Sequence, residues 1–178
     1  IKGYPPGIRE NGGQYTHAAA WTIIARAMQG RGDDAVGLFE MINPMNHTDT
    51  DDGVMTYQSE PYAFCGDVYS EGGFRGRAGW SWYTGSAGWM YQCGLEHILG
   101  LKIRADGFTV DPTLSRAWER AVIRYRRGAR LFEIEIDNTA KVERGVRRIV
   151  VNGADSGGGP VPFEAPGYDA HVRVVVVM

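Results

Sequence analysis

The sequence predicts an α+β protein of two parts, a helical part over residues 1–100 and a β-rich part over residues 101–178. In the first part, apolar residues recur at helical spacing between glycine-rich loops, which is typical of helix pairs from an α/α barrel or bundle. In the second part, apolar and polar residues alternate in short segments, which indicates a small antiparallel sandwich or sheet. We therefore expect two structural domains that meet near Gly100.

Three helices are predicted in the first part. Residues 16–29 are apolar on nearly every side, which predicts a buried helix that ends at the glycine after it. The next helix starts near the acidic pair at Asp33, because acidic residues favour a helix N-terminus, and it ends before Pro44. The third helix extends from about residue 85 to residue 99, and Gly100 stops it.

The second part contains alternating segments that predict strands. Residues 131–136 place phenylalanine and isoleucine on one face and glutamates on the other, and residues 131–136 and 121–125 flank Arg127-Gly128. Residues 146–151 lead into Asn152 and a glycine, which is a strong hairpin signal. Valines at alternate positions over residues 172–176 predict the last strand.

Composition and spacing exclude several classes of function. The net charge is −2, whereas a general nucleic-acid binder carries a basic surplus, so nucleic acid is not an expected partner. No segment is long and apolar enough to cross a bilayer. Residues 46–53 are acidic but lack the spacing of a calcium loop, so we expect a solvated loop and no metal site. Cys65 and Cys93 are expected to be reduced and buried, with a disulfide as the alternative.

The first candidate site is the polar segment from residue 4 to residue 17. Its side chains offer hydrogen-bond donors and acceptors to a polyhydroxylated ligand such as a sugar, with Tyr4, Arg9, Glu10 and Gln14 as the candidates. His17 stands at the front of a helix, where N–H groups point outward and favour an anion, and we expect Gln14 to share its helix face. The alternative is a polar loop whose side chains satisfy their own backbone.

The second candidate site is the aromatic and glycine-rich segment of residues 80–91. Thr84 is predicted to cap a helix, and Gly85 lets a ligand approach the free backbone N–H groups, so this helix start suits phosphate. The aromatic side chains around it can stack on sugar faces; they are Trp80, Trp82, Tyr83 and Trp89. The alternative is an ordinary capped helix with its tryptophans in the core.

Glu60 lies in a Ser-Glu-Pro-Tyr segment between these two sites. One interpretation is an inward-facing carboxylate that contacts substrate, and burial would then raise its pKa. The other is a carboxylate that caps or braces the neighbouring loops.

The order of three motifs resembles one known family. Residues 9–17 (Arg-Glu-Asn-Gly-Gly-Gln-Tyr-Thr-His), residues 59–62 (Ser-Glu-Pro-Tyr) and residues 79–90 (Gly-Trp-Ser-Trp-Tyr-Thr-Gly-Ser-Ala-Gly-Trp-Met) resemble glycoside hydrolase family 94. That family contains cellobiose and chitobiose phosphorylases, 1,2-β-oligoglucan phosphorylases and the C-terminal part of cyclic β-1,2-glucan synthases. The resemblance covers nearly the whole chain, and residues 4–15 look most like the cyclic glucan synthase branch.

This resemblance implies a fold and a set of ligand contacts. The fold would be the C-terminal part of an (α/α)6 barrel followed by an antiparallel β-sandwich. Phosphate would bind His17, Thr84 and Gly85, and the acceptor sugar would contact Arg9 and Glu10. Cellobiose phosphorylases carry a glutamine for the donor glucose near the position of Cys65 and Gly66 in this sequence; its absence favours a different linkage, such as β-1,2.

The implied reaction is inverting phosphorolysis of a β-glucoside to α-glucose 1-phosphate. Inorganic phosphate would be a co-substrate, and no other cofactor is expected. The general acid of the family is an aspartate in a Trp-Asn-Asp-Gly type motif well upstream of residues 9–17, and this motif is absent from the chain. We therefore expect a fragment that carries no catalytic residue of its own and is inactive alone.

Partners and location follow from the same resemblance. The expected partners are a β-glucan oligosaccharide, inorganic phosphate, the rest of the parent catalytic domain and a second copy, since members of the family often form homodimers. The expected location is the cytoplasm, or the cytoplasmic face of the bacterial inner membrane for a cyclic glucan synthase. Two alternatives stay open: a non-catalytic carbohydrate-binding module, and an enzyme of the same fold that uses water as the nucleophile.

Overall fold

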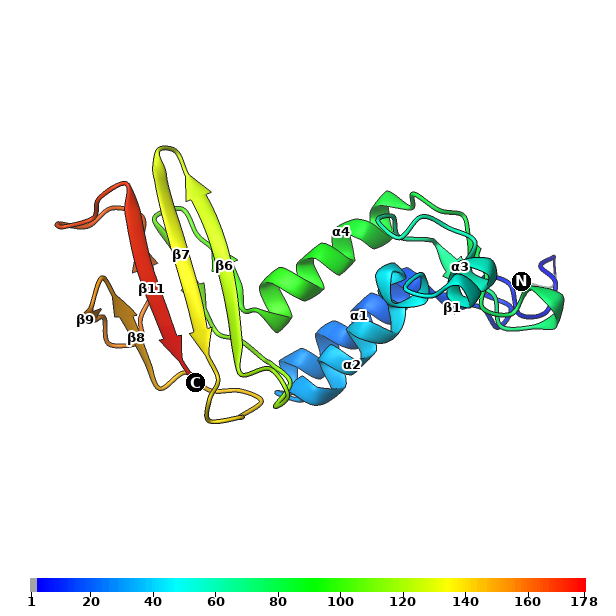
Figure 1. The fold of residues 1–178 in the computed structure, drawn as a ribbon, viewed down its shortest axis with the longest axis horizontal. Helices are drawn as coiled ribbons and strands as arrows, with labels where there is room; N and C mark the ends of the chain where they lie inside the picture. Colours follow the sequence, from blue (N-terminus) through cyan, green and yellow to red (C-terminus); the bar gives the residue numbers. More distant parts are fainter. Residues whose placement is uncertain (1–2) are drawn as a thin grey trace. The chain divides into compact units, whose positions relative to one another are not determined.

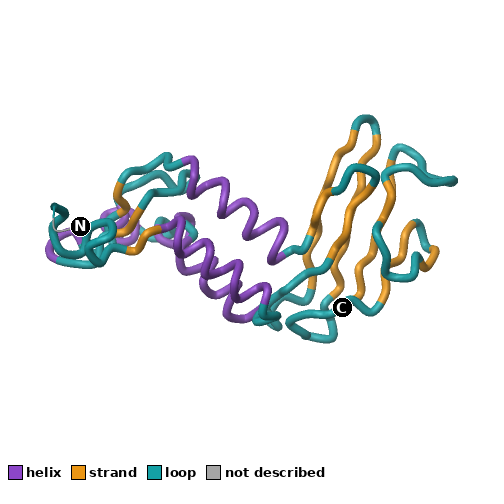
Figure 2. Tube along the Cα trace, turned by 180° about the vertical axis from the view of Figure 1, so that it is seen from behind, coloured by secondary structure: helices purple, strands orange, loops and turns teal. Residues whose placement is uncertain are grey.

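The computed structural model describes residues 3–178 as a mixed α+β chain. Within those residues it contains four α-helices and three β-sheets (Figure 1). The chain forms two compact units: the first contains residues up to Ala25 together with Gly37–Gly94, and the second contains Arg26–Val36 together with Leu95–Met178. Figure 2 shows that the long strands all belong to the second unit. The domain boundary expected near Gly100 stays a prediction.

The three predicted helices are present. They are α1 (Thr16–Met28), α2 (Gly32–Ile42) and α4 (Thr84–Gln92). Gly30 ends α1 in a left-handed conformation with φ of 74°, and its N–H donates to the carbonyl of Ala27 at 2.9 Å. The chain continues from α4 as a π-helix over Cys93–Ile98, and Gly100 ends it with φ of 74°. The glycine stops read from the sequence are therefore confirmed.

The acidic segment of residues 46–53 is not the loop that we expected. A short 3-10 helix (Pro44–His47) leads into a further helix, α3 (Asp51–Tyr57). The hydroxyl of Thr50 caps α3 by accepting a hydrogen bond from the N–H of Gly53 at 3.1 Å. The two aspartates that follow Thr50 lie in the first turn, where negative charge stabilises the helix dipole. The acidic run is thus a helix start signal.

The first unit contains a small three-stranded antiparallel sheet that positions two helix starts. Its strands are β1 (Gln14–Tyr15), β2 (Asp67–Val68) and β3 (Ala78–Gly79), in the order β1-β2-β3. Strand β1 runs directly into α1, and four residues separate β3 from α4. Since β1 and β3 are both antiparallel to β2, they run in the same direction. Helices α1 and α4 therefore both follow strands that end on the same side of the sheet.

The second unit contains the other two sheets. One has the order β10-β5-β4, and the other has the order β6-β7-β11-β8-β9. The strands are β4 (Leu101–Ile103), β5 (Gly107–Val110), β6 (Arg120–Arg127), β7 (Arg130–Asp137), β8 (Arg148–Val151), β9 (Ala154–Asp155), β10 (Val161–Pro162) and β11 (His171–Val177). Phe132, Ile134 and Ile136 are fully buried, which confirms the predicted alternation in β7. Asn152 has φ of 48°, as the predicted hairpin turn requires.

The larger sheet is not purely antiparallel, and the expectation was wrong on this point. Strand β11 pairs with β7 in parallel and with β8 in antiparallel orientation. Strands β7 and β8 therefore run in opposite directions, and β11 lies between them. A strand inserted between two antiparallel strands must be parallel to one of them, so the insertion itself explains the mixed sheet.

Aromatic side chains join the two sheets of the second unit. The ring of Phe108 on β5 lies 5.2 Å from the ring of Phe132 on β7, measured between centroids, and both side chains are fully buried. The ring of Phe163, which follows β10, lies 6.0 Å from both of these rings. Edge-to-face contacts of this kind add to the free energy gained by burying aromatic area. The core of the second unit is centred on this cluster.

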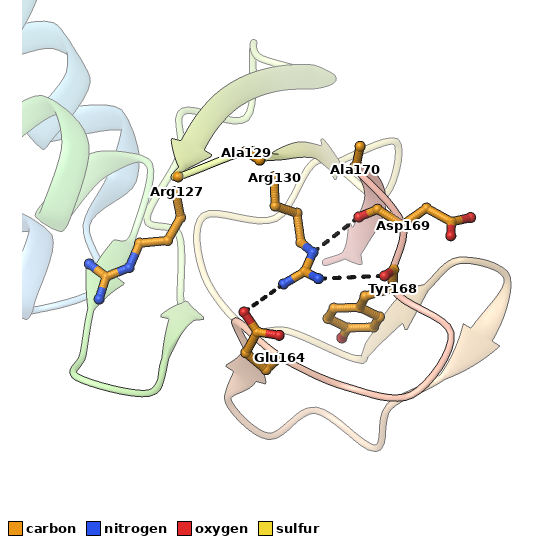
Figure 3. A pocket seen from close by; sticks show the side chains of 8 residues that line it. Arg127, Ala129, Arg130, Glu164, Tyr168, Asp169 and Ala170 are labelled. Carbon is orange, nitrogen blue, oxygen red and sulfur yellow. Dashed lines mark hydrogen bonds and ion pairs between the residues drawn. The ribbon is translucent and has the colours of Figure 1, made fainter.

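Arg130 anchors the loop before β11 (Figure 3). Its guanidinium donates to the carbonyls of Phe163 at 2.5 Å and Asp169 at 3.0 Å, and it forms an ion pair with Glu164 at 3.0 Å. A surface cavity of about 530 Å³ lies beside these residues. Because the donors of Arg130 are already used by backbone carbonyls, we interpret the cluster as structural and seek the functional site in the first unit.

Both cysteines are buried and free, as expected. The Sγ of Cys65 lies 3.5 Å from the hydroxyl of Tyr57, and the Sγ of Cys93 lies 3.2 Å from the carbonyl of Ala20. Burial raises the pKa of the Cys93 thiol to about 12. Cys93 therefore behaves as a small apolar side chain in the contact between α1 and α4.

Asp33 predicts how the stability of the second unit depends on pH. Its carboxylate accepts hydrogen bonds from the N–H of Arg116 at 2.8 Å, from the Arg116 side chain at 2.7 Å and from the hydroxyl of Ser115 at 2.9 Å. These bonds, the Arg116 backbone first, lower the pKa of Asp33. A carboxyl group whose pKa is lowered by folding stabilises the fold at pH values above its unfolded pKa, about 3.9. This contribution is lost as the pH falls through the folded pKa. We expect Asp33→Asn to be less stable near neutral pH and to lose less stability on acidification.

Chemical unfolding at pH values from about 7 down to about 2 measures this difference. The matched control is Asp34→Asn, which removes only surface ion pairs with Arg31 and Arg26. The control should keep the pH dependence of the original chain below about pH 4. Equal pH dependence in Asp33→Asn and the original chain would refute the role given to Asp33.

Candidate functional site

The candidate site surrounds the N-termini of α1 and α4 in the first unit (Figure 1). The ring of His17, the second residue of α1, lies 5.6 Å from the ring of Trp89 in α4. One turn further along both helices, Cys93 contacts the carbonyl of Ala20. Because the contacts advance together along both sequences, the two helices run parallel, and His17 in the first turn of α1 lies against Trp89, the sixth residue of α4. The start of α4 therefore extends about one and a half turns beyond His17. Both N-termini point in the same direction, and the positive end of a helix favours an anion.

His17 presents a buried nitrogen without a partner. Its Nε2 has no hydrogen-bond partner among residues 3–178 and is shielded from solvent. Its ring packs edge-on against Trp21 at 4.9 Å and against Trp89 at 5.6 Å, so its orientation is fixed. An unsatisfied buried polar atom costs about 1–3 kcal/mol, so such an atom in a folded protein calls for an explanation. A bound anion that accepts a hydrogen bond from Nε2–H would satisfy it.

The start of α4 offers backbone donors in open space. Tyr83, and not Thr84 as we expected, is the N-cap, and its side chain makes no capping hydrogen bond. Thr84 and Gly85 are instead the first two helical residues, and both are exposed. A Cβ atom added at Gly85 would meet no atom within 4 Å. Backbone N–H groups in the first turn of a helix have no intrahelical partner, so those at the start of α4 can donate to a ligand.

Ser86 belongs to the same turn, and we did not select it from the sequence as a site residue. Its side chain is fully buried, and its Oγ has no hydrogen-bond partner among residues 3–178. The one signal available was its place directly after Thr84 and Gly85. The hydroxyl of Ser86 therefore joins the hydroxyl of Thr84 and the N–H of Gly85 as a polar group in the first turn of α4.

Arg9 lies beside two aromatic rings, those of Trp80 and Tyr4. The guanidinium carbon of Arg9 lies 4.7 Å from the ring centre of Trp80 and 5.9 Å from that of Tyr4. Arg9 has φ of 48°, and its N–H donates to Oδ2 of Asp67 at 2.8 Å. Asp67 is buried, and its Oδ1 has no partner among the described residues. We did not identify Asp67 from the sequence, because a two-residue strand gives no periodicity.

Gln14 and His17 do not share a helix face, so that expectation was wrong. Gln14 lies in β1 and pairs with Val68, and the helix begins two residues later at Thr16. Val68 packs against the core formed by Tyr57, Cys65 and Ala78. Alternation along the strand puts Gln14 on this same face, and its Nε2 is buried without a partner in the described chain.

Tyr15 and Tyr83 link the two helix starts. Their hydroxyl oxygens lie 3.5 Å apart, and the register of β1 and β2 puts Tyr15 beside Asp67. The hydrogen bond with Tyr83 raises the pKa of Tyr15, and burial and the charge of Glu10 raise it further. Glu10 itself is exposed.

Glu60 braces a tryptophan. Its Oε1 accepts a hydrogen bond from Nε1 of Trp82 at 3.1 Å, and its Oε2 accepts one from the hydroxyl of Ser59 at 3.1 Å. Hydrogen bonds from its own backbone N–H, then from Trp82 and Ser59, lower the pKa of Glu60. Glu60 therefore makes the bracing hydrogen bonds of the second interpretation, and its contact with substrate stays a prediction.

Metal-ligand clusters and membrane-spanning helices are both absent from the described residues. Among residues 3–178, no three His, Cys, Asp or Glu side chains gather closely enough to hold a metal ion. Within the same residues, no helix combines the length and apolar character that crossing a membrane requires.

The first unit thus contains the starts of α1 and α4, the arginine Arg9 and exposed tryptophan side chains. Residues 1–100 match the family model for the catalytic domain of the glycosyl hydrolase 94 superfamily. The chain belongs to this family.

Characterised relatives are carbohydrate-active enzymes. Cyclic beta-(1,2)-glucan synthase NdvB of Rhizobium meliloti (strain 1021) is 50% identical over 118 residues, which is 66% of this chain and 4% of that protein. N,N'-diacetylchitobiose phosphorylase of Vibrio furnissii is 36% identical over 149 residues, or 83% of this chain and 18% of the relative. Solabiose phosphorylase of Paenibacillus borealis is 27% identical over 181 residues, which is 98% of this chain and 22% of that protein. The chain thus spans between 4% and 22% of the length of these relatives.

Proposed function

We propose that this chain forms the phosphate-binding part of an inverting β-glucan phosphorylase domain. The observation that carries the proposal is the buried Nε2 of His17, which has no hydrogen-bond partner within residues 3–178 and whose ring packs against Trp89 of α4. In the complete protein, residues 1–100 would close the end of an (α/α)6 barrel, and residues 101–178 would form the β-sandwich after it. The match to a glycosyl hydrolase 94 catalytic domain supports this assignment.

His17, Thr84 and Gly85 would hold inorganic phosphate. Nε2–H of His17, the hydroxyl of Thr84 and the N–H of Gly85 are donors, and hydrogen bonds to an ionised oxyanion are stronger than neutral ones. A phosphate oxygen then attacks the anomeric carbon and forms the new C–O bond, while the glycosidic C–O bond breaks on the opposite face. A carboxylic acid gives its proton to the leaving oxygen, and the product is α-glucose 1-phosphate.

The general acid is proposed to lie outside these 178 residues. An inverting hydrolase needs a second carboxylate to activate water, whereas phosphate is already a nucleophile that the site only has to hold and orient. The half of the site described above does this holding. The chain alone would then bind phosphate without turnover.

Arg9, Glu10 and Tyr4 would contact the sugar, together with Glu60 and Gln14. The guanidinium of Arg9, supported by Trp80 and Tyr4, can donate to sugar hydroxyls. A β-1,2 linkage is supported by the 50% identity to a cyclic beta-(1,2)-glucan synthase.

The partners follow from this function. They are a β-glucan oligosaccharide, inorganic phosphate as the co-substrate without further cofactor, and the remainder of the catalytic domain. We also propose a homodimer, and a place in the cytoplasm or on the cytoplasmic face of the bacterial inner membrane. The relatives that are phosphorylases support the sugar and phosphate partners alone.

Titration of the 178-residue chain with inorganic phosphate, followed by calorimetry and by 31P NMR, tests the proposal. We expect saturable binding that His17→Ala weakens and that His171→Ala, at an exposed histidine of β11, leaves unchanged. We expect no α-glucose 1-phosphate when a β-glucan is added. Absent binding, or equal binding by both variants, would refute the phosphate site. Turnover by the chain alone would refute the external general acid and favour a complete enzyme.

A further inference from the structure

We propose that Trp82, Tyr62 and Glu60, the Trp82 platform, form a sugar-binding subsite for a glucosyl unit further along the β-glucan chain. The inference rests on the proposed function, because it deepens the substrate assignment from a β-glucoside to an oligosaccharide longer than a disaccharide. It concerns a surface other than the one that contains Arg9.

The platform presents aromatic faces to solvent. The side chains of Trp82 and Tyr62 are 62% and 74% exposed, and their ring centroids lie 5.8 Å apart at an angle of 67°. Large apolar side chains left in solvent as a pair, with polar groups beside them, are typical of a binding surface. The two rings form a corner that can cover a flat ligand on two sides.

The tryptophan is held in place before any ligand arrives. Its Nε1–H donates a hydrogen bond to one carboxylate oxygen of Glu60, and the hydroxyl of Ser59 donates to the other oxygen. These hydrogen bonds restrict the orientation of the indole. Trp82 also has φ of 60°, a left-handed conformation that costs a bulky residue about 1–3 kcal/mol. Such strain persists mainly at functional sites, and a fixed aromatic face loses little entropy on binding.

The chemistry of the platform matches a glucosyl ring. Equatorial hydroxyls leave both ring faces of a β-glucosyl unit covered by C–H groups, and these stack on an indole while the hydroxyls point outward. Each carboxylate oxygen of Glu60 accepts one hydrogen bond from a protein side chain and keeps further lone pairs for sugar hydroxyls. The lowered pKa of Glu60 keeps it ionised, and therefore an acceptor, at neutral pH.

The platform is separate from the Arg9 surface but close to the phosphate site. Trp80 contacts Arg9 at 4.7 Å and Tyr83 at 4.9 Å, whereas Trp82 contacts Glu60 and Tyr62. Trp82 precedes Thr84 by two residues, so their Cα atoms are at most about 7 Å apart. One glucan chain can therefore place a unit on each aromatic surface while its end reaches the phosphate.

The indole N–H signals of the 15N-labelled chain test the subsite. The chain has five tryptophans, and Trp82→Phe assigns the Trp82 signal by its loss. On titration with a β-1,2-linked trisaccharide or tetrasaccharide we expect the Trp82 signal to shift saturably, and we expect glucose to have a much weaker effect. Tyr62→Ala should weaken oligosaccharide binding about tenfold, equal to about 1.4 kcal/mol and near the value of one aromatic contact. Tyr91→Ala, which removes an exposed tyrosine of α4, is the matched control.

Inorganic phosphate added to the same samples separates this proposal from the function on which it rests. If phosphate binds but the Trp82 signal stays fixed at all oligosaccharide concentrations, the subsite is refuted and the phosphate site stands. If the Trp82 signal moves but phosphate does not bind, the subsite stands and the chain acts as a carbohydrate-binding module. Equal oligosaccharide affinity of Tyr62→Ala and Tyr91→Ala would also refute the subsite.

Discussion

Replacing His17 with alanine in the complete enzyme is expected to lower kcat/KM for phosphorolysis by a factor of about 10²–10³, the usual loss when one donor to a reacting oxyanion is removed. The buried Nε2 has no other partner within residues 3–178, so its hydrogen bond is available to phosphate. The remaining donors at Thr84 and Gly85 can still bind phosphate weakly. Initial rates at varied phosphate and fixed glucan measure the effect.

The controls for His17 separate phosphate binding from folding. Its ring packs between Trp21 and Trp89, so alanine removes packing as well as a donor. His17→Gln keeps an N–H donor near the same place and should recover part of the activity, while thermal unfolding reports the loss of packing. The KM for phosphate should rise more than the KM for glucan. An enzyme whose phosphate dependence is unchanged in His17→Ala would contradict the assigned role.

Replacing Gly100 with alanine is expected to destabilise the second unit by about 3 kcal/mol or more, since left-handed strain and overpacking each cost about 1–3 kcal/mol. Gly100 has φ of 74°, and an added Cβ would lie 2.2 Å from the carbonyl carbon of Asp111. The clash is with backbone, which side-chain rotation does not relieve. The carbonyl of Gly100 also accepts the N–H of Asp111 at 3.0 Å, so relaxation there weakens the contact between β4 and β5. Denaturant unfolding measures the loss.

Gly128→Ala is the matched control for Gly100. Gly128 has φ of 58° in the hairpin between β6 and β7, and an added Cβ would meet nothing within 4 Å. It therefore carries the strain without the clash, and about 1 kcal/mol of destabilisation is expected. Equal losses in the two variants would show that the close approach to Asp111 has no energetic consequence.

Local sequence patterns predicted most of the secondary structure. Apolar spacing predicted α1, α2 and α4, and the glycines at positions 30 and 100 ended helices where left-handed backbone is needed. Alternation in β7 predicted which of its side chains are buried. These features depend on neighbours within a few residues, so they can be read without the fold. The start of α3 is also local, and its Thr50 cap was overlooked beside an acidic run that resembled a loop.

Features that depend on distant residues were not predictable in the same way. The parallel pairing of β11 with β7 follows from where the last strand inserts, and no local pattern encodes that. The placement of Gln14 depends on its partner Val68 across a two-residue strand. Asp67 and Ser86 are identified only in the structure, because each has a buried side-chain oxygen without a hydrogen-bond partner among residues 3–178. The motifs therefore predicted where a site would lie, and the structure added groups that have no hydrogen-bond partner within residues 3–178.

The products of the complete enzyme acting on a β-glucan in phosphate buffer test the central claim most directly. Proton and 31P NMR during the first turnovers distinguish α-glucose 1-phosphate from its β-anomer and from free glucose. We predict the α-anomer, formed at a rate that depends on phosphate and that falls in His17→Ala. Free glucose released at a rate independent of phosphate would show that water is the nucleophile, and it would contradict the phosphate site at the starts of α1 and α4.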